Sequence, residues 1–152
     1  MPAVNNHYAS ADRYCITLLT HGQRTLLADG GVRLIPTPTG NATVAAWLAL
    51  LQALPRLVTE AVYLTSSTIY IIVTVKDGAN NAASLRLLHS AVRRFKNETT
   101  RRYNSNSTQD YHSRLWQTAF GCEPVLTPAQ HAAFERQMAA QGAYQAVDSR
   151  VD

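Results

Sequence analysis

The sequence predicts an α/β (α+β) protein, with an antiparallel sheet of four to five strands flanked by helices and an extra C-terminal helix. Runs rich in β-branched and aromatic residues at 13–20, 61–65 and 68–75 predict strands. Apolar residues recur at helical spacing in 43–54, 81–97 and 128–147, which predicts amphipathic helices packed against the sheet. These two periodicities together favour a layered fold over an all-helical or all-strand one.

The first two elements are predicted to form a hairpin. Residues 13–20 are a strand, 21–23 supply a short turn, and 24–28 then pair back antiparallel. Gly30 and Gly31 end this run, because glycine accepts backbone angles that β-branched residues disfavour.

The middle of the chain is predicted to contain a helix followed by two strands. Residues 43–54 carry an apolar helical stripe that Asn41 or Thr43 caps and Pro55 ends. Seven of the eight residues in 68–75 are β-branched and both faces are largely apolar, which is typical of a central strand covered on two sides. Two residues separate this strand from 61–65, so the two strands are expected to be antiparallel neighbours.

Three helices are predicted in the second half. The first covers 81–97 and is followed by a polar loop at 103–109. A shorter amphipathic helix follows at 110–120. Thr127, with proline and glutamine after it, forms the start of a capping box, and the alanine-rich helix that it opens extends to about Val147.

Length and composition favour one compact domain. The chain has 152 residues, of which 46% are apolar and 16% charged, so it supports a real core and is too short for a two-domain enzyme. A fibrous repeat and a largely disordered chain are excluded. We expect a flexible leader at 1–12, a single domain at 13–121 and a C-terminal helical extension at 122–152.

Cysteine usage and hydropathy predict a cytoplasmic location. Two cysteines are too few for the disulfide framework of a small secreted domain. The polar start lacks the apolar stretch of a signal peptide, and the sequence contains no run long enough for a membrane span.

Positive charge is concentrated in one part of the chain. Residues 76–114 contain eight basic and three acidic residues, whereas the whole chain has a formal charge of +4. Six of the basic residues lie on or just beyond the helix predicted at 81–97: Arg86, Arg93, Arg94, Lys96, Arg101 and Arg102. The pattern fits a solvated helix face, a surface for an acidic protein or lipid head groups, or a nucleic-acid interface.

No set of residues in the sequence forms a catalytic or metal-binding motif. The five histidines lack ligand spacing, and Gly30–Gly31 lacks the lysine of a phosphate-binding loop. We therefore predict no catalytic residue, no metal and no cofactor, and expect a protein that acts by binding. Trp47, Trp116 and Phe120 are candidates for hydrophobic interface anchors, and burial in the core is the alternative for each.

One stretch resembles the middle of a ribonuclease H domain. It comprises Thr39-Gly-Asn-Ala-Thr with the helix after it, and then Val62-Tyr-Leu-Thr-Ser-Ser. Phosphodiester cleavage with two metal ions needs clustered carboxylates. The positions that match the carboxylates of that domain are Thr43 and Thr65 in this sequence, so only Asp29 remains as a candidate carboxylate. This resemblance implies a catalytically inactive domain that binds nucleic acid through its arginine-rich helix.

The order of elements over 13–121 resembles the longin-like fold. The best-matching segments are 62–81, the helix Ser84-Leu-Arg-Leu-Leu-His-Ser-Ala-Val-Arg-Arg-Phe, and Ser113-Arg-Leu-Trp-Gln-Thr-Ala-Phe. They look like the second half of sedlin and other small TRAPP subunits, and less closely like the sigma subunits of clathrin adaptors. The resemblance implies a noncatalytic subunit of a vesicle-tethering complex.

The partners implied by this second resemblance are other protein subunits, a Rab-type GTPase and the surface of Golgi or ER-derived vesicles. Nucleic acid is a partner only in the ribonuclease H alternative. A strand at 68–75 favours the longin-like fold, and a helix there favours the ribonuclease H fold.

Overall fold

The computed structural model describes residues 12–76, 82–105, 114–125 and 127–148. Its main sheet has five antiparallel strands in the order β6-β1-β5-β4-β7. They are β1 (Asp12–Leu19), β4 (Leu57–Leu64), β5 (Thr68–Val75), β6 (Gly121–Pro124) and β7 (Tyr144–Asp148). The predicted class, an antiparallel sheet flanked by helices, is therefore confirmed. Apart from Asp12, the expected leader lies outside the described residues.

The predicted hairpin between 13–20 and 24–28 is wrong. β1 pairs along its whole length with β5, from Asp12 opposite Val75 to Leu19 opposite Thr68, and with β6 on its other side. After the short 3-10 turn η2 (His21–Gln23), only Ala28–Asp29 form a strand, β2, which pairs with β3 (Ile35–Pro36). Pairing with β5 on one edge and β6 on the other satisfies backbone hydrogen-bonding groups on both edges of β1, so residues 24–28 have no edge of β1 to pair with.

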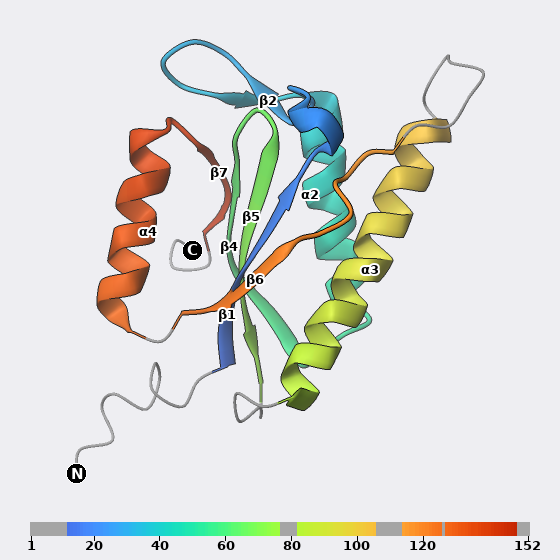
Figure 1. Ribbon diagram of the computed structural model, residues 1–152, viewed down its shortest axis with the longest axis vertical. Helices are drawn as coiled ribbons and strands as arrows, with labels where there is room; N and C mark the ends of the chain where they lie inside the picture. The colour runs from blue at the N-terminus through green and yellow to red at the C-terminus, as the bar shows by residue number, and fades with distance from the viewer. Residues whose placement is uncertain (1–11, 77–81, 106–113, 126, 149–152) are drawn as a thin grey trace.

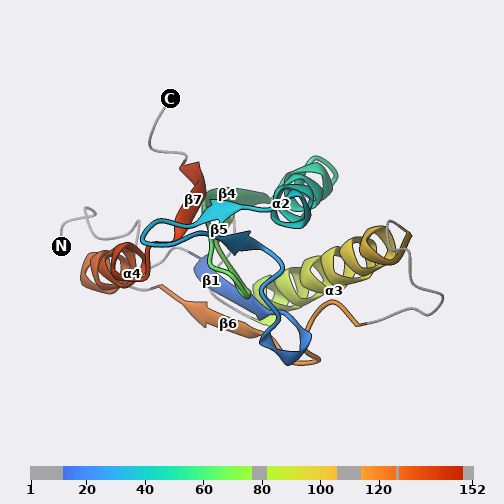
Figure 2. The same ribbon diagram turned by 90° about the horizontal axis from the view of Figure 1, so that it is seen from above.

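Helices α2 (Pro38–Leu51) and α3 (Ala82–Ser105) cover one face of the sheet, and α4 (Pro128–Ala140) lies on the other (Figures 1 and 2). The larger core fills the space between the sheet and α2 and α3. Phe95 of α3 is central to it, with its ring 5.5 Å from Trp47 and 5.9 Å from Trp116, centroid to centroid. This packing fixes α3 with its opposite side toward solvent.

A smaller apolar cluster lies between the sheet and α4. Phe134 of α4 makes edge-to-face contacts with Tyr63 and Tyr70, at centroid distances of 5.5 and 5.7 Å. Met138, one turn later, is buried against Ile72 of β5. Two side chains of this short helix thus provide most of its apolar anchoring.

Two helices differ from the prediction at their ends. α2 begins at Pro38, because the Thr37 hydroxyl accepts a hydrogen bond from the Gly40 amide at 3.0 Å. The predicted caps, Asn41 and Thr43, therefore lie inside the helix. α3 continues to Ser105, eight residues past the predicted end, so that part of the predicted polar loop is helical.

The C-terminal region also differs from the prediction. Residues 114–120 are not helical, and Trp116 instead forms an isolated bridge with Thr20; residues 110–113 of that predicted helix lie outside the described ones. The capping box at Thr127 is confirmed, but α4 ends at Ala140 and does not reach Val147. Residues 144–148 form β7, which extends the sheet beside β4. Among the described residues, no helix has the length and hydropathy needed to cross a membrane.

Candidate functional site

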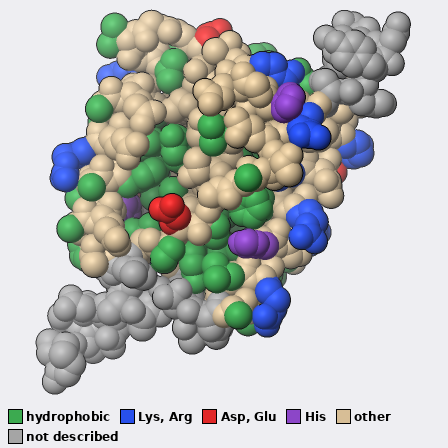
Figure 3. All heavy atoms as spheres, in the orientation of Figure 1, with side chains coloured by type: hydrophobic (Ala, Val, Ile, Leu, Met, Phe, Trp, Pro, Cys, Tyr) green, Lys and Arg blue, Asp and Glu red, His purple; other side chains and the backbone are tan. Residues whose placement is uncertain are grey.

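The outer side of α3 is a cationic surface. The helix contains six basic residues and one acidic residue, so it alone has a formal charge of +5. Its inner side buries Leu88, Val92 and Phe95 in the core. Arg86, Arg93, Arg94, Arg101 and Arg102 are all exposed. Most of the Lys and Arg side chains visible in Figure 3 lie along the edge formed by α3 and the η2 turn.

Four of these arginines form a continuous stripe, which we call the arginine stripe: Arg86, Arg93, Arg94 and Arg101. At 3.6 residues per turn they fall within about 100° of the helix circumference and span about 22 Å of its axis. The exposed residues between them on the same arc are Ser90 and Asn97, which are small, polar and uncharged. No acidic residue of α3 lies on this arc. The stripe therefore presents positive charge next to neutral hydrogen-bonding groups.

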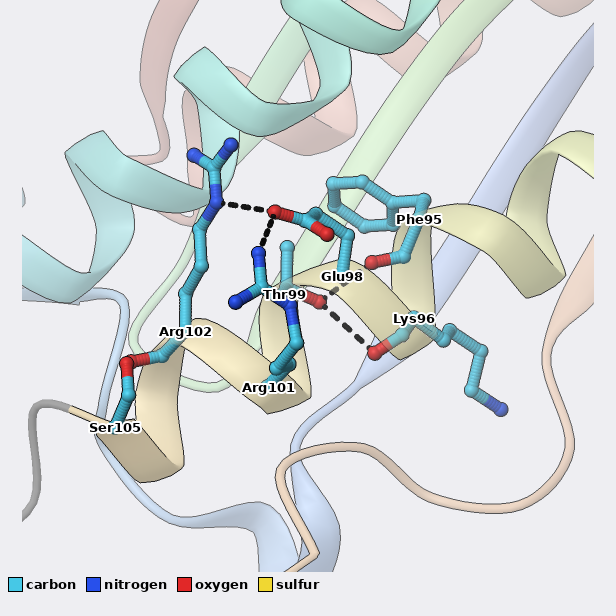
Figure 4. A network of polar contacts seen from close by, with 7 residues as sticks. All are labelled: Phe95, Lys96, Glu98, Thr99, Arg101, Arg102 and Ser105. Atoms are coloured by element: carbon cyan, nitrogen blue, oxygen red, sulfur yellow. Dashed lines mark hydrogen bonds and ion pairs between the residues drawn. The ribbon is translucent and has the colours of Figure 1, made fainter.

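The single carboxylate of α3 neutralises only one edge of this surface. Glu98 Oε2 accepts hydrogen bonds from Arg101 Nη2 and Arg102 Nε, each at 2.6 Å (Figure 4). These bonds, chiefly the one from Arg101, lower the pKa of the Glu98 carboxyl. Among the described residues, Arg86, Arg93 and Arg94 form no ion pair. Their guanidinium groups are therefore available to an anionic ligand.

Lys96, included among the predicted surface cations, has an internal role. Its ammonium donates to the carbonyl oxygens of Gln117 and Thr118, both at 2.8 Å, and lies 5.9 Å from the centroid of the Phe120 ring. Burial, reinforced by the charge of Arg114, lowers the pKa of Lys96. Figure 4 shows its side chain pointing away from Arg101 and Arg102. Lys96 thus holds the 114–120 segment against α3.

Sequence reasoning missed two arginines that tertiary structure brings to the same edge. Arg24 donates to the carbonyl oxygens of His21 and Arg114, and its guanidinium lies 5.9 Å from the Tyr103 ring centroid at the end of α3. Arg114 itself donates to Thr118 Oγ1 at 3.0 Å. Arg24 lies outside the basic segment 76–114, and Arg114 is the last residue of that segment, twelve positions after Arg102, so their place in the sequence does not indicate that they lie near α3.

The three predicted hydrophobic anchors lie mostly in the interior. Trp47 and Trp116 are 0% and 2% exposed. Their indole N–H groups donate to Thr59 Oγ1 and Thr99 Oγ1, both at 2.8 Å. Phe120 is half-buried against the core, with its ring 5.1 Å from that of His89. The two tryptophans therefore stabilise the fold and offer little surface to a partner.

The opposite face of the sheet carries tyrosines and one buried ion pair. Arg13 Nε donates to Glu60 Oε2 at 2.8 Å, and the Thr74 hydroxyl donates to the same oxygen. Burial raises the pKa of Tyr70. In the parts of the chain that the structure describes, no group of three or more His, Cys, Asp or Glu side chains could hold a metal ion.

The positions that match the ribonuclease H pattern do not converge on a carboxylate cluster. Asp29 is exposed in β2, and the Thr43 hydroxyl donates to the Thr39 carbonyl at 2.8 Å within α2. Residues 68–75, where that resemblance requires a helix, form strand β5. The ribonuclease H element order is thus not found at this position.

Comparisons with known proteins find a similar fold in a transposase. No protein-family model and no curated protein matches the chain. A solved structure of a REP-associated tyrosine transposase bound to a REP hairpin is similar, with a TM-score of 0.57 and 14% sequence identity. The match covers 84% of this chain and 64% of that chain, so the protein spans less than two thirds of the transposase. At this identity the likeness establishes the shared fold.

The predicted kinship with sedlin, other small TRAPP subunits and clathrin-adaptor sigma subunits is wrong, since a solved structure with a similar fold is that of a transposase. The vesicle-trafficking role inferred from that kinship is therefore also wrong. The resemblance rests on the order of elements and on residue types. A long helix after two antiparallel strands occurs in many two-layer folds, so this pattern does not discriminate between them.

Proposed function

We propose that this protein binds nucleic acid and that the arginine stripe of α3 holds its phosphate backbone. The observation that carries the proposal is the stripe itself, in which four exposed arginines lie on one arc without an acidic residue. Support also comes from the fold, which is similar to that of a transposase bound to a REP hairpin. Nucleic-acid binding is the function that the ribonuclease H resemblance also suggested.

The dimensions of the stripe suit the side of a duplex stem. One strand of a duplex presents a phosphate about every 3.4 Å, so the stripe of about 22 Å faces about six nucleotides. A guanidinium donates two parallel hydrogen bonds to a phosphate, which makes arginine suited to this contact. Because Leu88, Val92 and Phe95 fix the opposite side of α3 in the core, these arginines project from a rigid support. We therefore propose the stem of a hairpin or another duplex as the ligand.

Contacts of this kind position a duplex without identifying its bases. Ser90 and Asn97 lie among the arginines and extend the set of phosphate donors. The proposed stripe thus recognises charge and shape, and its affinity depends on salt concentration.

The proposal is tested with a fluorescein-labelled hairpin of about twelve base pairs and fluorescence anisotropy. Replacing both Arg93 and Arg94 with Glu should weaken binding about tenfold or more, because it places two negative charges opposite the phosphates. The matched control replaces Arg33 and Arg136, which are exposed and lie outside α3, with Glu. This control alters the net charge equally and should weaken binding by less than about threefold.

Two outcomes would contradict the proposal. One is an unmodified protein that fails to bind the hairpin at low salt. The other is an equal loss of affinity in both double variants, because net charge and not the stripe would then account for binding. Far-ultraviolet circular dichroism of each variant verifies that the fold is retained.

We further propose that binding occurs without strand cleavage by the residues on the α4 face of the sheet. A tyrosine hydroxyl becomes a nucleophile when an adjacent base, a lowered pKa or a metal ion activates it, and burial instead raises the pKa of Tyr70. The Glu60 carboxylate on the same face is already engaged by Arg13 and Thr74. Incubation of the end-labelled hairpin with the protein and Mg²⁺ or Mn²⁺ should leave the hairpin intact on a denaturing gel. A shortened strand or a covalent protein–nucleic acid adduct would contradict this proposal.

A further inference from the structure

A surface groove adjoins the arginine stripe along the first half of α3. It has a volume of about 520 Å³, and we call it the α3 groove. Its lining consists of residues at helical spacing: Ala82, Leu85, Arg86, His89, Ser90 and Arg93. Arg86 and Arg93 belong to both the groove and the stripe, so a ligand held by the stripe passes beside the groove.

The composition of the groove differs from that of the stripe. Leu85 is 39% exposed, on a helix whose other outward-facing residues are mostly polar or charged. The His89 ring beside it is held edge-to-face by Phe120, with 5.1 Å between centroids. Phe120 is in turn fixed by Lys96, whose ammonium is 5.9 Å from its ring centroid. The groove thus combines an exposed aliphatic side chain with a supported aromatic ring.

We infer that the α3 groove binds an unpaired nucleobase next to the stem held by the arginine stripe. This inference rests on the proposed function. Within this lining, Leu85 and the His89 ring suit the flat face of a base, which stacks on such side chains in single-strand binding sites. Arg86 and Arg93 lie two turns apart, about 10 Å along the helix axis, with His89 between them and Leu85 directly before Arg86. They are placed to hold the phosphates on either side of that base.

This inference specifies the ligand more closely than the proposed function does. A fully paired stem presents its bases stacked and paired, so none is available to the groove. A stem with a single-stranded extension or a bulge supplies one, and it should bind more tightly than a blunt stem of the same length.

The test uses three hairpins with an identical stem: one blunt, one with three unpaired nucleotides at the 5′ end and one with three at the 3′ end. We expect one of the extended hairpins to bind about tenfold more tightly than the blunt one. A 2-aminopurine at the unpaired positions should change in fluorescence on binding, because stacking quenches this base analogue. This second measurement reports contact with the base directly.

Two variants assign the effect to the groove. Leu85→Ser, alone or with His89→Ala, should remove the preference for the extended hairpin and leave the affinity for the blunt one unchanged. Leu48→Ser is the matched control, because Leu48 is a leucine on α2 with 40% exposure that lies outside the groove. It should preserve the preference. Arg94→Gln, which changes the stripe but not the groove, should weaken binding of the extended and blunt hairpins alike.

The outcomes separate this inference from the proposed function. Equal binding of extended and blunt hairpins by the unmodified protein would overturn the inference and leave the proposed function intact. A preference that survives in Leu85→Ser with His89→Ala would also overturn it. Failure to bind any of the three hairpins would instead contradict the proposed function.

Discussion

Thr99 is the residue that connects the cationic helix to the segment that follows it. Its hydroxyl donates to the Phe95 carbonyl at 2.7 Å and accepts the indole N–H of Trp116 at 2.8 Å. Both Thr99 and Trp116 are buried. A buried N–H without an acceptor costs free energy, so this hydroxyl fixes where the 114–120 segment lies on α3.

Thr99→Val should therefore lower the free energy of unfolding by about 1–3 kcal/mol, because valine has a similar shape but offers no acceptor to Trp116. Urea denaturation followed by tryptophan fluorescence measures the change. Thr100→Val is the control, since the next residue along α3 is half-buried and the helix propensities are similar. Equal effects of the two substitutions would show that the hydrogen bond to Trp116 contributes little.

The two cysteines are residues whose ionisation depends on the fold. Burial raises the pKa of Cys15 and of Cys122 to about 11, from an ordinary value of 9.0. The thiols therefore ionise in the unfolded chain at a lower pH than in the folded one. Their contribution to stability is fully present below pH 9 and is lost as the pH rises toward 11.

We expect the urea midpoint to decrease as the pH is raised from 8.5 to 10.5. The decrease should be less steep in the double variant Cys15→Ala, Cys122→Ala. Comparing the two pH dependences isolates the thiols, because the tyrosines and lysines titrate in both proteins. Identical slopes in the two proteins would mean that the folded and unfolded thiols ionise alike.

Gly40 determines how closely helix α2 approaches the preceding loop. A Cβ at this position would lie 1.9 Å from the carbonyl oxygen of Leu27, a backbone atom that cannot move aside easily. The same loop is attached to the helix start, since Thr37 donates its hydroxyl hydrogen to the Leu26 carbonyl at 2.5 Å. Replacement of this glycine would therefore displace α2 as a whole.

Gly40→Ala should destabilise the protein by several kcal/mol, although the same change inside an exposed helix stabilises by about 1 kcal/mol. The sign of the change in thermal midpoint thus tests the close contact. Gly31→Ala is the control, because a Cβ there meets nothing within 4 Å. An unchanged or raised midpoint for Gly40→Ala would mean that α2 is not held against Leu27.

At the scale of the whole molecule, charge is distributed unevenly between α3 and the remainder of the chain. The chain has a formal charge of +4 and α3 alone has +5, so the remainder is slightly negative. α3 lies at one side of the molecule, away from α4 (Figure 2). An anionic ligand is therefore attracted to one side of the protein.

This asymmetry predicts the salt dependence of hairpin binding. Four phosphate contacts by the arginine stripe give a slope of about −3.6 for log K against log salt concentration. Replacing Arg93 and Arg94 with Gln should make the slope shallower by about 2, whereas Arg136→Gln should leave it unchanged. Anisotropy titrations between 50 and 200 mM salt measure the slopes. For comparison, a protein that makes six phosphate contacts binds about 10³-fold more weakly at the upper end of such a range. A slope near zero would contradict binding through the stripe.

Much of the fold was predictable from local patterns. β5 has the predicted bounds, and the Thr127 capping box starts α4 where expected. The cationic helix was also predictable, because six basic residues within 17 positions form an excess that does not depend on tertiary contacts. The predicted helix is wrong over 114–120, because Trp116 is buried by a bridge to Thr20, just after β1, and by contacts with Phe95 and Thr99 of α3.

The residues themselves specify the periodicity of β1, β5, α2 and α3 and the charge of α3, because these properties depend on neighbours within a few positions. Long-range packing places β5 and β6 on the two sides of β1 and buries Trp47 and Trp116. It also directs Lys96 to carbonyl oxygens of the 114–120 segment and brings Arg24 and Arg114 to α3. The physical reason is that strand pairing and burial minimise exposed apolar area and unpaired polar groups over the entire chain. No window of the sequence contains both members of such a distant contact.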